Sequence, residues 1–313
     1  MIIGHERQIG YFDEARRRGH VAHAYIFYGP SSVGKYAVAT AFAQSFFCVQ
    51  VGVGIREVCG SCAECLRVTH GTHPFVRVLD GDARDEEDKA QEISIDAIRA
   101  LRRECALAPG GGNARVVIAN AADRMSEEAS HAFLKILEEP PPRTYLVCVT
   151  TQKELLLQTI LSRSQAIYFG EVVKEKIVLL LEKRGIAAGE REEIATLAGG
   201  RPGRAVALAG DNAARKELQS VTRKVRIALE RRDVPEALEI SERAAASSRI
   251  RAYAIEALWH AIRARMRSPA AYSIGRIMAV KRADAIMTSL EETNVNPRLG
   301  LDMLLLEAMR IFG

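Results

Sequence analysis

The sequence lacks the long apolar segments that membrane-spanning helices need. Its apolar runs stop well short of the ~20 consecutive residues that cross a bilayer. The first residues, Met1–Arg7, also lack the apolar stretch of a secretory signal. These two absences predict a cytoplasmic protein without a membrane partner.

The sequence also lacks a strong excess of charge of one sign. Its formal net charge is +5, from 44 basic and 39 acidic residues. So small an excess over 313 residues does not by itself indicate nucleic-acid binding. With 48% hydrophobic and 27% charged residues, the composition is typical of a globular chain that buries a core. The length predicts two or three domains.

Apolar runs and helix-forming stretches alternate through the first half of the sequence. We interpret the apolar runs as buried strands, at residues 24–28, 74–79, 115–119, 145–150 and 166–169. Helix-forming stretches lie at residues 2–19, 37–47, 96–107 and 126–139, the last with Ser126 as its N-cap. This alternation predicts an α/β fold with a parallel sheet and helices on both faces. The acidic run 80–92 and the glycine-rich residues 109–113 are predicted to be loops.

The strand pattern stops after Gly170. Helical periodicity follows at residues 172–185 and 191–197, and a glycine-rich turn at 199–204 opens another helix. Residues 211–313 are helical in pattern, with breaks near 233–235, 268–269 and 294–297. We therefore predict three domains: an α/β domain at 1–170, a small helical lid at 171–210 and an all-helical domain at 211–313.

Residues Gly29–Tyr36 contain the pattern Gly-x4-Gly-Lys between a predicted strand and a predicted helix. In this setting, backbone N–H groups and a helix N-terminus face a phosphate group. The candidate nucleotide-binding residues are Gly29, Ser32, Gly34 and Lys35. A solvent-exposed remnant is the alternative interpretation of Lys35.

The residues that would hold magnesium and activate water are absent from their expected positions. Tyr36 follows Lys35, where the motif needs Ser or Thr, and a rigid phenol cannot replace that small hydroxyl. The strand 116–119 should be followed by acids, but Asn120 and Ala121 stand there. Asp123 lies further along and is expected to cap a helix. We therefore expect no magnesium site and no hydrolysis of ATP by this chain, and whether ATP or ADP binds stays open.

Four of the six cysteines, Cys48, Cys59, Cys62 and Cys65, lie within one insertion. Tight Cys-x2-Cys turns supply thiolates to a tetrahedral zinc ion, and four protein ligands leave no position open for catalysis. The spacing predicts a structural zinc module at 48–65, with reduced, unligated thiols as the alternative. Cys105 and Cys148 are expected in the core, and His70 and His73 at the surface.

Several short motifs occur in a specific order: Ile3–Glu6 with Ala22–Tyr25, the cysteine insertion, Ala132–Pro141, Thr159–Gln165 and Gly203–Arg204. This order resembles the bacterial clamp-loader family of AAA+ proteins over nearly the whole chain. The resemblance implies a P-loop AAA+ domain with a zinc module, a helical lid and a C-terminal collar through which subunits form a ring. It also implies a place in the DNA polymerase III holoenzyme. The substitutions at Tyr36, Asn120 and Ala121 match the family's non-hydrolysing member, which serves as a scaffold.

The resemblance also implies partners and roles for single residues. The partners are ATPase subunits of the tau/gamma type, the delta subunit, the sliding clamp and, through the assembled complex, primer-template DNA. Arg163 corresponds to an arginine that reaches the ATP of a neighbouring subunit, with Ser164 in place of the family's cysteine. Without the motif, Arg163 would be a surface arginine at a helix C-terminus. Arg204 corresponds to a phosphate-sensing lid arginine. Thr150 and Thr151 occupy the position of a polar sensor, with strand-end capping as the alternative.

Other features and two other functions stay open. The collar would bury apolar faces such as Met303–Leu306 and Ile255–Trp259, which packing within one domain explains equally well. Arg99, Arg102 and Arg103 are expected to form a solvated face, with DNA contact as the alternative. The first other function is an active ATPase with unusual metal ligands. The second is a DNA-binding zinc module, although Arg56 is the only basic residue between its outer cysteines.

Overall fold

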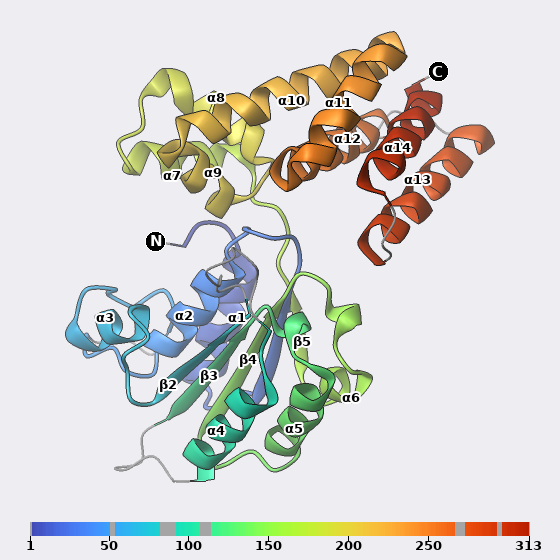
Figure 1. Cartoon of the computed structure of the whole chain (residues 1–313). Helices are drawn as coiled ribbons and strands as arrows, with labels where there is room; N and C mark the ends of the chain where they lie inside the picture. Colours follow the sequence, from blue (N-terminus) through green and yellow to red (C-terminus); the bar gives the residue numbers. More distant parts are fainter. Residues whose placement is uncertain are drawn as a thin grey trace. The chain divides into compact units, whose positions relative to one another are not determined.

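The computed structural model of the chain describes residues 2–50, 54–81, 92–106, 114–266, 273–292 and 296–312 (Figure 1). The chain divides into two compact units, residues 1–207 and 208–313. Most of the predicted loop 80–92 (residues 82–91), the predicted loop 109–113 and the predicted break at 268–269 lie outside the described residues. Asp80, at the start of the first of these loops, belongs instead to a strand. No described helix has both the length and the apolar character needed to cross a membrane.

The first unit is built on a sheet of five parallel strands in the order β2-β3-β4-β1-β5. The strands are β1 (Ala24–Tyr28), β2 (Val76–Asp80), β3 (Arg115–Asn120), β4 (Thr144–Thr150) and β5 (Gln165–Tyr168). In β1, Ile26 lies opposite Cys148 on one side and Ala166 on the other. The predicted α/β class and parallel sheet are confirmed. Because the strands run in one direction, the loops after β1, β3 and β4 gather at the same edge.

Helices cover both faces of this sheet (Figure 1). The helices are α1 (Glu6–Arg17) and α2 (Lys35–Gln44) on one face, and α4 (Ile95–Ala106), α5 (Glu127–Glu138) and α6 (Gln158–Ser162) on the other. Alternate residues of β1 serve the two faces, since successive side chains of a strand point in opposite directions. Tyr25 and Phe27 pack in the α1–α2 cluster, and Ala24 and Ile26 pack in the α4–α5–α6 cluster. One strand therefore supports both layers.

Helix α5 begins where the sequence predicts. The Ser126 hydroxyl accepts a hydrogen bond from the backbone N–H of Ala129 at 3.1 Å, which satisfies one of the unpaired donors of the first turn. Phe133 and Ile136 are buried against the sheet. The helix ends at Glu138, shortly before Pro140–Pro142, which cannot continue it. Glu138 is thereby placed at the C-terminal end of the helix.

Three helices follow the sheet where the sequence predicts a lid: α7 (Lys174–Lys183), α8 (Ala188–Ala198) and α9 (Pro202–Gly210). Between α8 and α9, Gly199 and Gly200 both have positive φ, at 58° and 79°. The backbone N–H of Val172 donates to the Gly200 carbonyl at 2.8 Å, so this turn is tied to the segment that follows the sheet. A separate lid domain at 171–210 stays a prediction.

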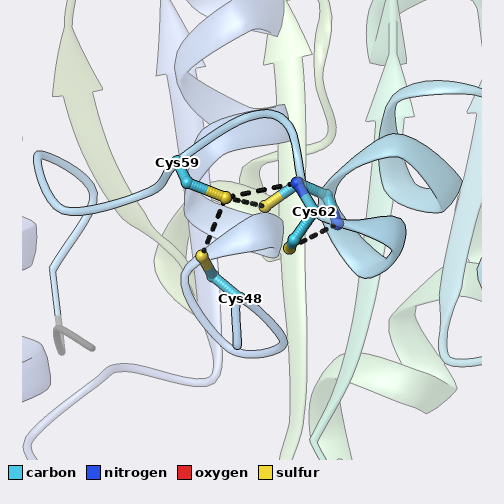
Figure 2. Close-up of side chains that lie close together, drawn as sticks. Cys48, Cys59 and Cys62 are labelled. Carbon is cyan, nitrogen blue, oxygen red and sulfur yellow. Dashed lines mark hydrogen bonds between the residues drawn. The ribbon is translucent and has the colours of Figure 1, made fainter. Parts of the chain in front are cut away.

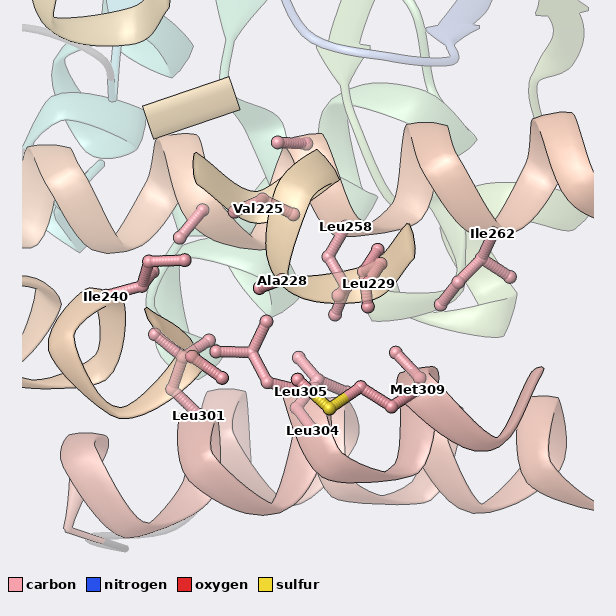
Figure 3. Close-up of a cluster of buried hydrophobic side chains, with 14 of the residues drawn as sticks. Val225, Ala228, Leu229, Ile240, Leu258, Ile262, Leu301, Leu304, Leu305 and Met309 are labelled. Atoms are coloured by element: carbon pink, nitrogen blue, oxygen red, sulfur yellow. The ribbon is translucent and has the colours of Figure 1, made fainter. Parts of the chain in front are cut away.

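The second unit contains the helices α10 (Asn212–Arg231), α11 (Val234–Ala246), α12 (Ser248–Met266), α13 (Ile274–Glu292) and α14 (Pro297–Phe312). They enclose an apolar core that includes Val225, Leu258, Leu304 and Leu305 (Figure 3). The run Met303–Leu306 divides between core and surface, because Leu304 and Leu305 are buried while Met303 and Leu306 are exposed. Part of this apolar run is therefore left for solvent or for another surface.

Candidate functional site

The loop between β1 and α2, where the sequence predicts phosphate binding, contains several residues with left-handed backbone angles. Gly29, Ser32 and Gly34 have positive φ angles of 136°, 59° and 112°. A Cβ atom on Gly29 would lie only 2.1 Å from the carbonyl oxygen of Phe169, so a larger residue cannot replace this glycine without moving the backbone. The sequence-predicted residues of the loop are therefore brought together in one turn at the carboxyl end of β1.

The Lys35 ammonium group is bonded to the loop itself. Lys35 is only 6% exposed, and its Nζ donates to the carbonyls of Gly29 at 2.6 Å and Pro30 at 2.7 Å. The interpretation of Lys35 as a solvent-exposed remnant is wrong, because the aliphatic stem is buried and the ammonium is hydrogen-bonded inside the turn. A phosphate group entering the loop would have to draw Nζ away from two acceptors.

Two further elements close on the same loop. The backbone N–H of Gly203, in the first turn of α9, donates to the Ser32 carbonyl at 2.8 Å. The His5 ring nitrogen Nε2 lies 2.9 Å from the Val33 carbonyl, which it contacts as a donor in the Nε2–H tautomer. Arg204, the predicted phosphate sensor, follows Gly203 on α9 and is half-buried. The motif Ile3–Glu6 includes His5, but its sequence does not predict the contact with Val33, which lies far along the chain.

At the end of β3, an amide occupies the position where a hydrolysing site needs a metal-binding acid. The Asn120 side-chain amide donates to Asp80 Oδ1, at the end of β2, at 2.8 Å. The next residue, Ala121, has a φ of 52°, unusual for a non-glycine residue. Tyr36 is the second residue of α2 and is 40% exposed. Partial burial and the charge of Asp80 raise the pKa of its phenol. A neutral phenol and an amide are poor ligands for magnesium, which prefers carboxylates and small hydroxyls.

Asp123 and Thr150 are bonded to one another. The Thr150 hydroxyl donates to Asp123 Oδ1 at 2.5 Å and accepts from the backbone N–H of Gln152 at 3.1 Å. Asp123 lies in the short 3-10 helix η2 (Ala122–Arg124), so the expectation that it caps a helix is wrong. Its carboxylate turns toward β4 because the chain makes a tight turn at Ala121. Thr150 therefore caps the end of its strand, in agreement with the capping alternative.

Arg163 is found at the surface, at the C-cap of the short helix α6. Its guanidinium contacts Glu138 Oε1 at 3.1 Å, the Thr159 carbonyl at 3.3 Å and the Ser162 hydroxyl at 3.4 Å. The side chain is 39% exposed. These contacts of Arg163 are with residues of α5 and α6. The contact with Glu138 was not foreseen, because the two residues are distant in sequence.

The four cysteines of the insertion converge on one point (Figure 2). Their sulfur atoms all lie within 4.8 Å of one another, with 3.6 Å between Cys48 and Cys59 and 3.9 Å between Cys59 and Cys65. A tetrahedron of about 2.3 Å zinc–sulfur bonds has sulfur–sulfur edges of about 3.8 Å. The described cluster can therefore hold a tetrahedral metal ion, and its all-thiolate donor set suits a structural site.

Backbone N–H groups favour the thiolate form at this cluster. The N–H of Cys62 points at Cys59 Sγ at 3.3 Å, and the N–H of Cys65 points at Cys62 Sγ at 3.5 Å (Figure 2). Hydrogen bonds from Ser61 and Cys62 lower the pKa of the Cys59 thiol to about 6, whereas burial raises the pKa of Cys65. A metal is bound by thiolates, so the turn between Cys59 and Cys62 is already shaped for one.

The cysteine cluster is anchored to the sheet domain by buried polar contacts. The Gln44 amide, at the end of α2, donates to the Cys65 carbonyl at 2.9 Å. On the other side of the insertion, Asp13 of α1 accepts a hydrogen bond from the backbone N–H of Ile55 at 2.6 Å. Asp13 also pairs with Arg56 at 3.4 Å. Arg56, the one basic residue of the insertion, is therefore used to hold the module against α1.

His73 is buried, and the prediction that it lies at the surface is wrong. Its ring packs on Phe47 with 4.1 Å between centroids, and its Nε2 lies 3.3 Å from Glu64 of helix α3 (Ala63–Thr69). Burial lowers the pKa of His73, although the Glu64 charge opposes this shift. The ring is covered because the strand that follows brings it beneath the cysteine module. Cys105 and Cys148 are buried as predicted, and His70 is exposed.

Comparisons with known proteins identify relatives of this chain. The family model described as "DNA polymerase III, delta subunit" matches residues 4–172. The subunit delta' of DNA polymerase III from Bacillus subtilis is 36% identical over 152 residues, which are 49% of this chain and 43% of that protein. The delta' subunit from Pseudomonas aeruginosa is 35% identical over 146 residues, 47% of this chain and 42% of that protein.

Other subunits and structures are also similar. The tau subunit of Bacillus subtilis DNA polymerase III is 31% identical over 182 residues, 58% of this chain and 31% of that protein. A solved DNA polymerase III gamma subunit-related protein from Thermotoga maritima has 19% identity and a TM-score of 0.41, covering 96% of this chain and 99% of that one. The matches span less than half of the length of these curated relatives.

The family match covers more than half of the 313 residues, and it includes the sheet, the phosphate loop, the cysteine cluster and Arg163. The motifs that carry the resemblance, from Ile3–Glu6 to Gly203–Arg204, all fall within the first compact unit, and Gly203–Arg204 lies beyond the family match. The chain belongs to the DNA polymerase III delta-subunit family of clamp-loader proteins.

Proposed function

We propose that this chain is the non-hydrolysing, delta-prime-type subunit of a DNA polymerase III clamp loader. The observation that carries the proposal is Asn120 at the end of β3, where an ATPase needs a metal-binding acid. Its side-chain amide is hydrogen-bonded to Asp80. Tyr36 and Ala121 remove the metal's hydroxyl ligand and the general base. With these three substitutions in one site, the chain lacks the usual ligands for a catalytic magnesium ion and the usual general base.

In this role the chain supplies Arg163 to the ATP of a neighbouring ATPase subunit. An arginine provided in trans stabilises the charge that develops on the transferred phosphoryl group and is worth roughly 10³–10⁵ in rate. The partly exposed guanidinium at the end of α6, whose contacts are with residues of α5 and α6, supports such a role. The chain then serves as a scaffold that completes an active site on another subunit.

The remaining parts of the proposal concern partners and metal. Subunits of the tau/gamma and delta types would join this chain in the loader, and the sliding clamp and primer-template DNA would meet the assembled complex. The second unit would act as the collar, and the exposed Met303 and Leu306 support an apolar contact there. The four cysteines would hold a structural zinc ion that closes the insertion, with no position left for substrate.

The test is DNA-stimulated ATP turnover by the reconstituted loader containing wild-type chain or Arg163→Ala. We expect assembly to be unchanged and the turnover of the one site facing this subunit to be lost. Arg17→Ala is a matched control, because Arg17 is an exposed arginine of the same unit whose ion pair with Glu14 is local. Equal turnover by wild type and Arg163→Ala in a fully assembled loader would overturn the trans role.

An active ATPase with unusual ligands is the competing function. If it were correct, the isolated chain would hydrolyse ATP, and replacing Tyr36, Asn120 and Ala121 by Ser, Asp and Glu would alter that rate. Our proposal expects no turnover from the isolated wild-type chain. A DNA-binding zinc module is less favoured, because Arg56 is already paired with Asp13.

A further inference from the structure

We infer that Glu138 is a positioning residue for Arg163, and that it orders the arginine before a neighbouring subunit meets it. This inference rests on the proposed function, since it concerns how Arg163 is presented to the neighbour's ATP. The contact that carries it is the ion pair between Arg163 and Glu138 Oε1, at 3.1 Å between heavy atoms. The two residues come from different helices, α6 and α5.

The location of Glu138 is unfavourable for its own helix. Glu138 is the last residue of α5, and the C-terminal end of a helix carries a partial negative charge that repels a carboxylate. Helix stability therefore does not explain an acid at this position. The Arg163 guanidinium offsets the local negative charge, so the two side chains stabilise each other's placement.

Three acceptors fix the direction of the arginine. Besides Glu138, the Thr159 carbonyl and the Ser162 hydroxyl lie near Arg163 Nη1, at 3.3 and 3.4 Å. Glu138 contacts the other terminal nitrogen, Nη2. A guanidinium has five N–H donors, so these contacts orient the plane of the group and leave further donors for a phosphate. A long side chain that would otherwise sample many rotamers is held in one orientation.

The strength of the ion pair suits positioning rather than inhibition. Both side chains are partly exposed, 39% for Arg163 and 48% for Glu138, and exposed pairs of this kind are weak. An arginine acting on a transferred phosphoryl group contributes far more than such a pair. Glu138 therefore orders Arg163 without preventing its transfer to the neighbour's phosphate.

The test compares Glu138→Gln with Glu139→Gln in the reconstituted loader. Glu139 is the matched control, because it is the next residue and has no ion pair among the described residues. Glu138 and Glu139 both line a surface cavity of about 350 Å³. The quantity measured is the part of ATP turnover that depends on Arg163, obtained by subtracting the Arg163→Ala rate. We expect Glu138→Gln to lower this part about two- to five-fold, the range that an exposed charge pair supports.

Two further readouts separate positioning from a structural effect. The ATP concentration for half-maximal turnover and the thermal unfolding midpoint should stay the same in Glu138→Gln. In the Arg163→Ala background, Glu138→Gln should have no additional effect, because it acts only through the arginine. An equal loss in both backgrounds would overturn the inference.

The outcomes also distinguish this inference from the proposed function. If Arg163→Ala lowers turnover while Glu138→Gln matches Glu139→Gln, the inference fails and the proposed function stands. A rise in turnover with Glu138→Gln would also overturn it, since Glu138 would then compete with the phosphate for Arg163. If Arg163→Ala itself has no effect, the proposed function fails, and the inference fails with it.

Discussion

Gly203 donates its backbone N–H to the carbonyl of Ser32 at 2.8 Å, so helix α9 of the lid begins against the phosphate loop. A Cβ atom on Gly203 would lie 3.0 Å from this same carbonyl oxygen. With the Lys35 ammonium bonded to Gly29 and Pro30, the loop is held from inside and outside by the chain's own groups. The turn is therefore supported by hydrogen bonds from within the chain itself.

Replacing Lys35 by methionine should destabilise the first unit. The change leaves the Gly29 and Pro30 carbonyls without the buried donor, which costs about 1–3 kcal/mol in the free energy of unfolding. Urea denaturation measures this difference. Lys174→Met is the control, because Lys174 forms a surface pair with Glu192 and its loss should cost less than about 1 kcal/mol. Equal stability of wild type and Lys35→Met would show that the loop does not depend on this lysine.

The cysteine cluster should bind one metal ion per chain. Cys59→Ser and Cys62→Ser should each remove that ion and lower the thermal unfolding midpoint, because the insertion loses its cross-link. Cys105→Ser is the control, since Cys105 is buried in the sheet domain outside the cluster. Metal analysis of the purified proteins gives the stoichiometry. Purified wild-type chain without bound metal, with all four thiols reduced, would contradict this expectation.

The thiols should differ sharply in their reactivity and in its dependence on pH. Burial raises the pKa of Cys148 to about 12, so its reactive thiolate is scarce at all pH values between 6 and 9. Cys59, with a pKa of about 6, is mostly thiolate above that pH once metal has been removed. Mass-spectrometric mapping after alkylation at pH 7 should therefore label Cys59 in chelator-treated protein and leave Cys148 unmodified until urea is added.

The same alkylation assay also tests the direction in which thiol reactivity changes with pH. For Cys59, lowering the pH below about 6 should suppress alkylation, because the thiolate becomes protonated. For Cys148, raising the pH from 7 to 9 should produce little labelling in the folded chain. Rapid alkylation of Cys148 in native protein at pH 7 would contradict its placement in the core.

The run Met303–Leu306 allows a paired test of core and surface in the second unit. Leu305 is fully buried, so Leu305→Ala should lower the free energy of unfolding by about 2–5 kcal/mol through lost contacts and a cavity. Leu306→Ala removes the same atoms from an exposed position and should cost much less. If Leu306→Ala prevents assembly of the loader while leaving the isolated chain stable, the collar proposal gains support. Comparable destabilisation by both variants would place Leu306 in the core.

The sequence predicted those features that follow from local patterns. Apolar runs such as Ala24–Tyr28 indicated the strands, and Ser126 indicated the start of α5, because periodicity and capping are local properties. The spacing of the cysteines likewise predicted their convergence. These elements were close to their observed bounds.

The features that could not be predicted from the sequence depend on tertiary contacts between separate elements. His73 is buried because Phe47, far along the chain, and Glu64, on the preceding helix α3, come to lie against it. The burial of Lys35, the bond of Asp123 to Thr150 and the pairing of Arg163 with Glu138 arise in the same way. Such pairings are set by tertiary packing and have no local signal.

Gly29 shows that the fold itself can require residues of a nucleotide-binding motif. Its lack of a side chain is required by the Phe169 carbonyl of its own chain, 2.1 Å from where a Cβ atom would be. Lys35 is likewise kept in place by carbonyls of the loop. Selection for folding alone would thus maintain much of the Gly-x4-Gly-Lys pattern in a descendant that never uses ATP. The Gly-x4-Gly-Lys pattern therefore does not by itself indicate ATP turnover, which also depends on the residues around the loop.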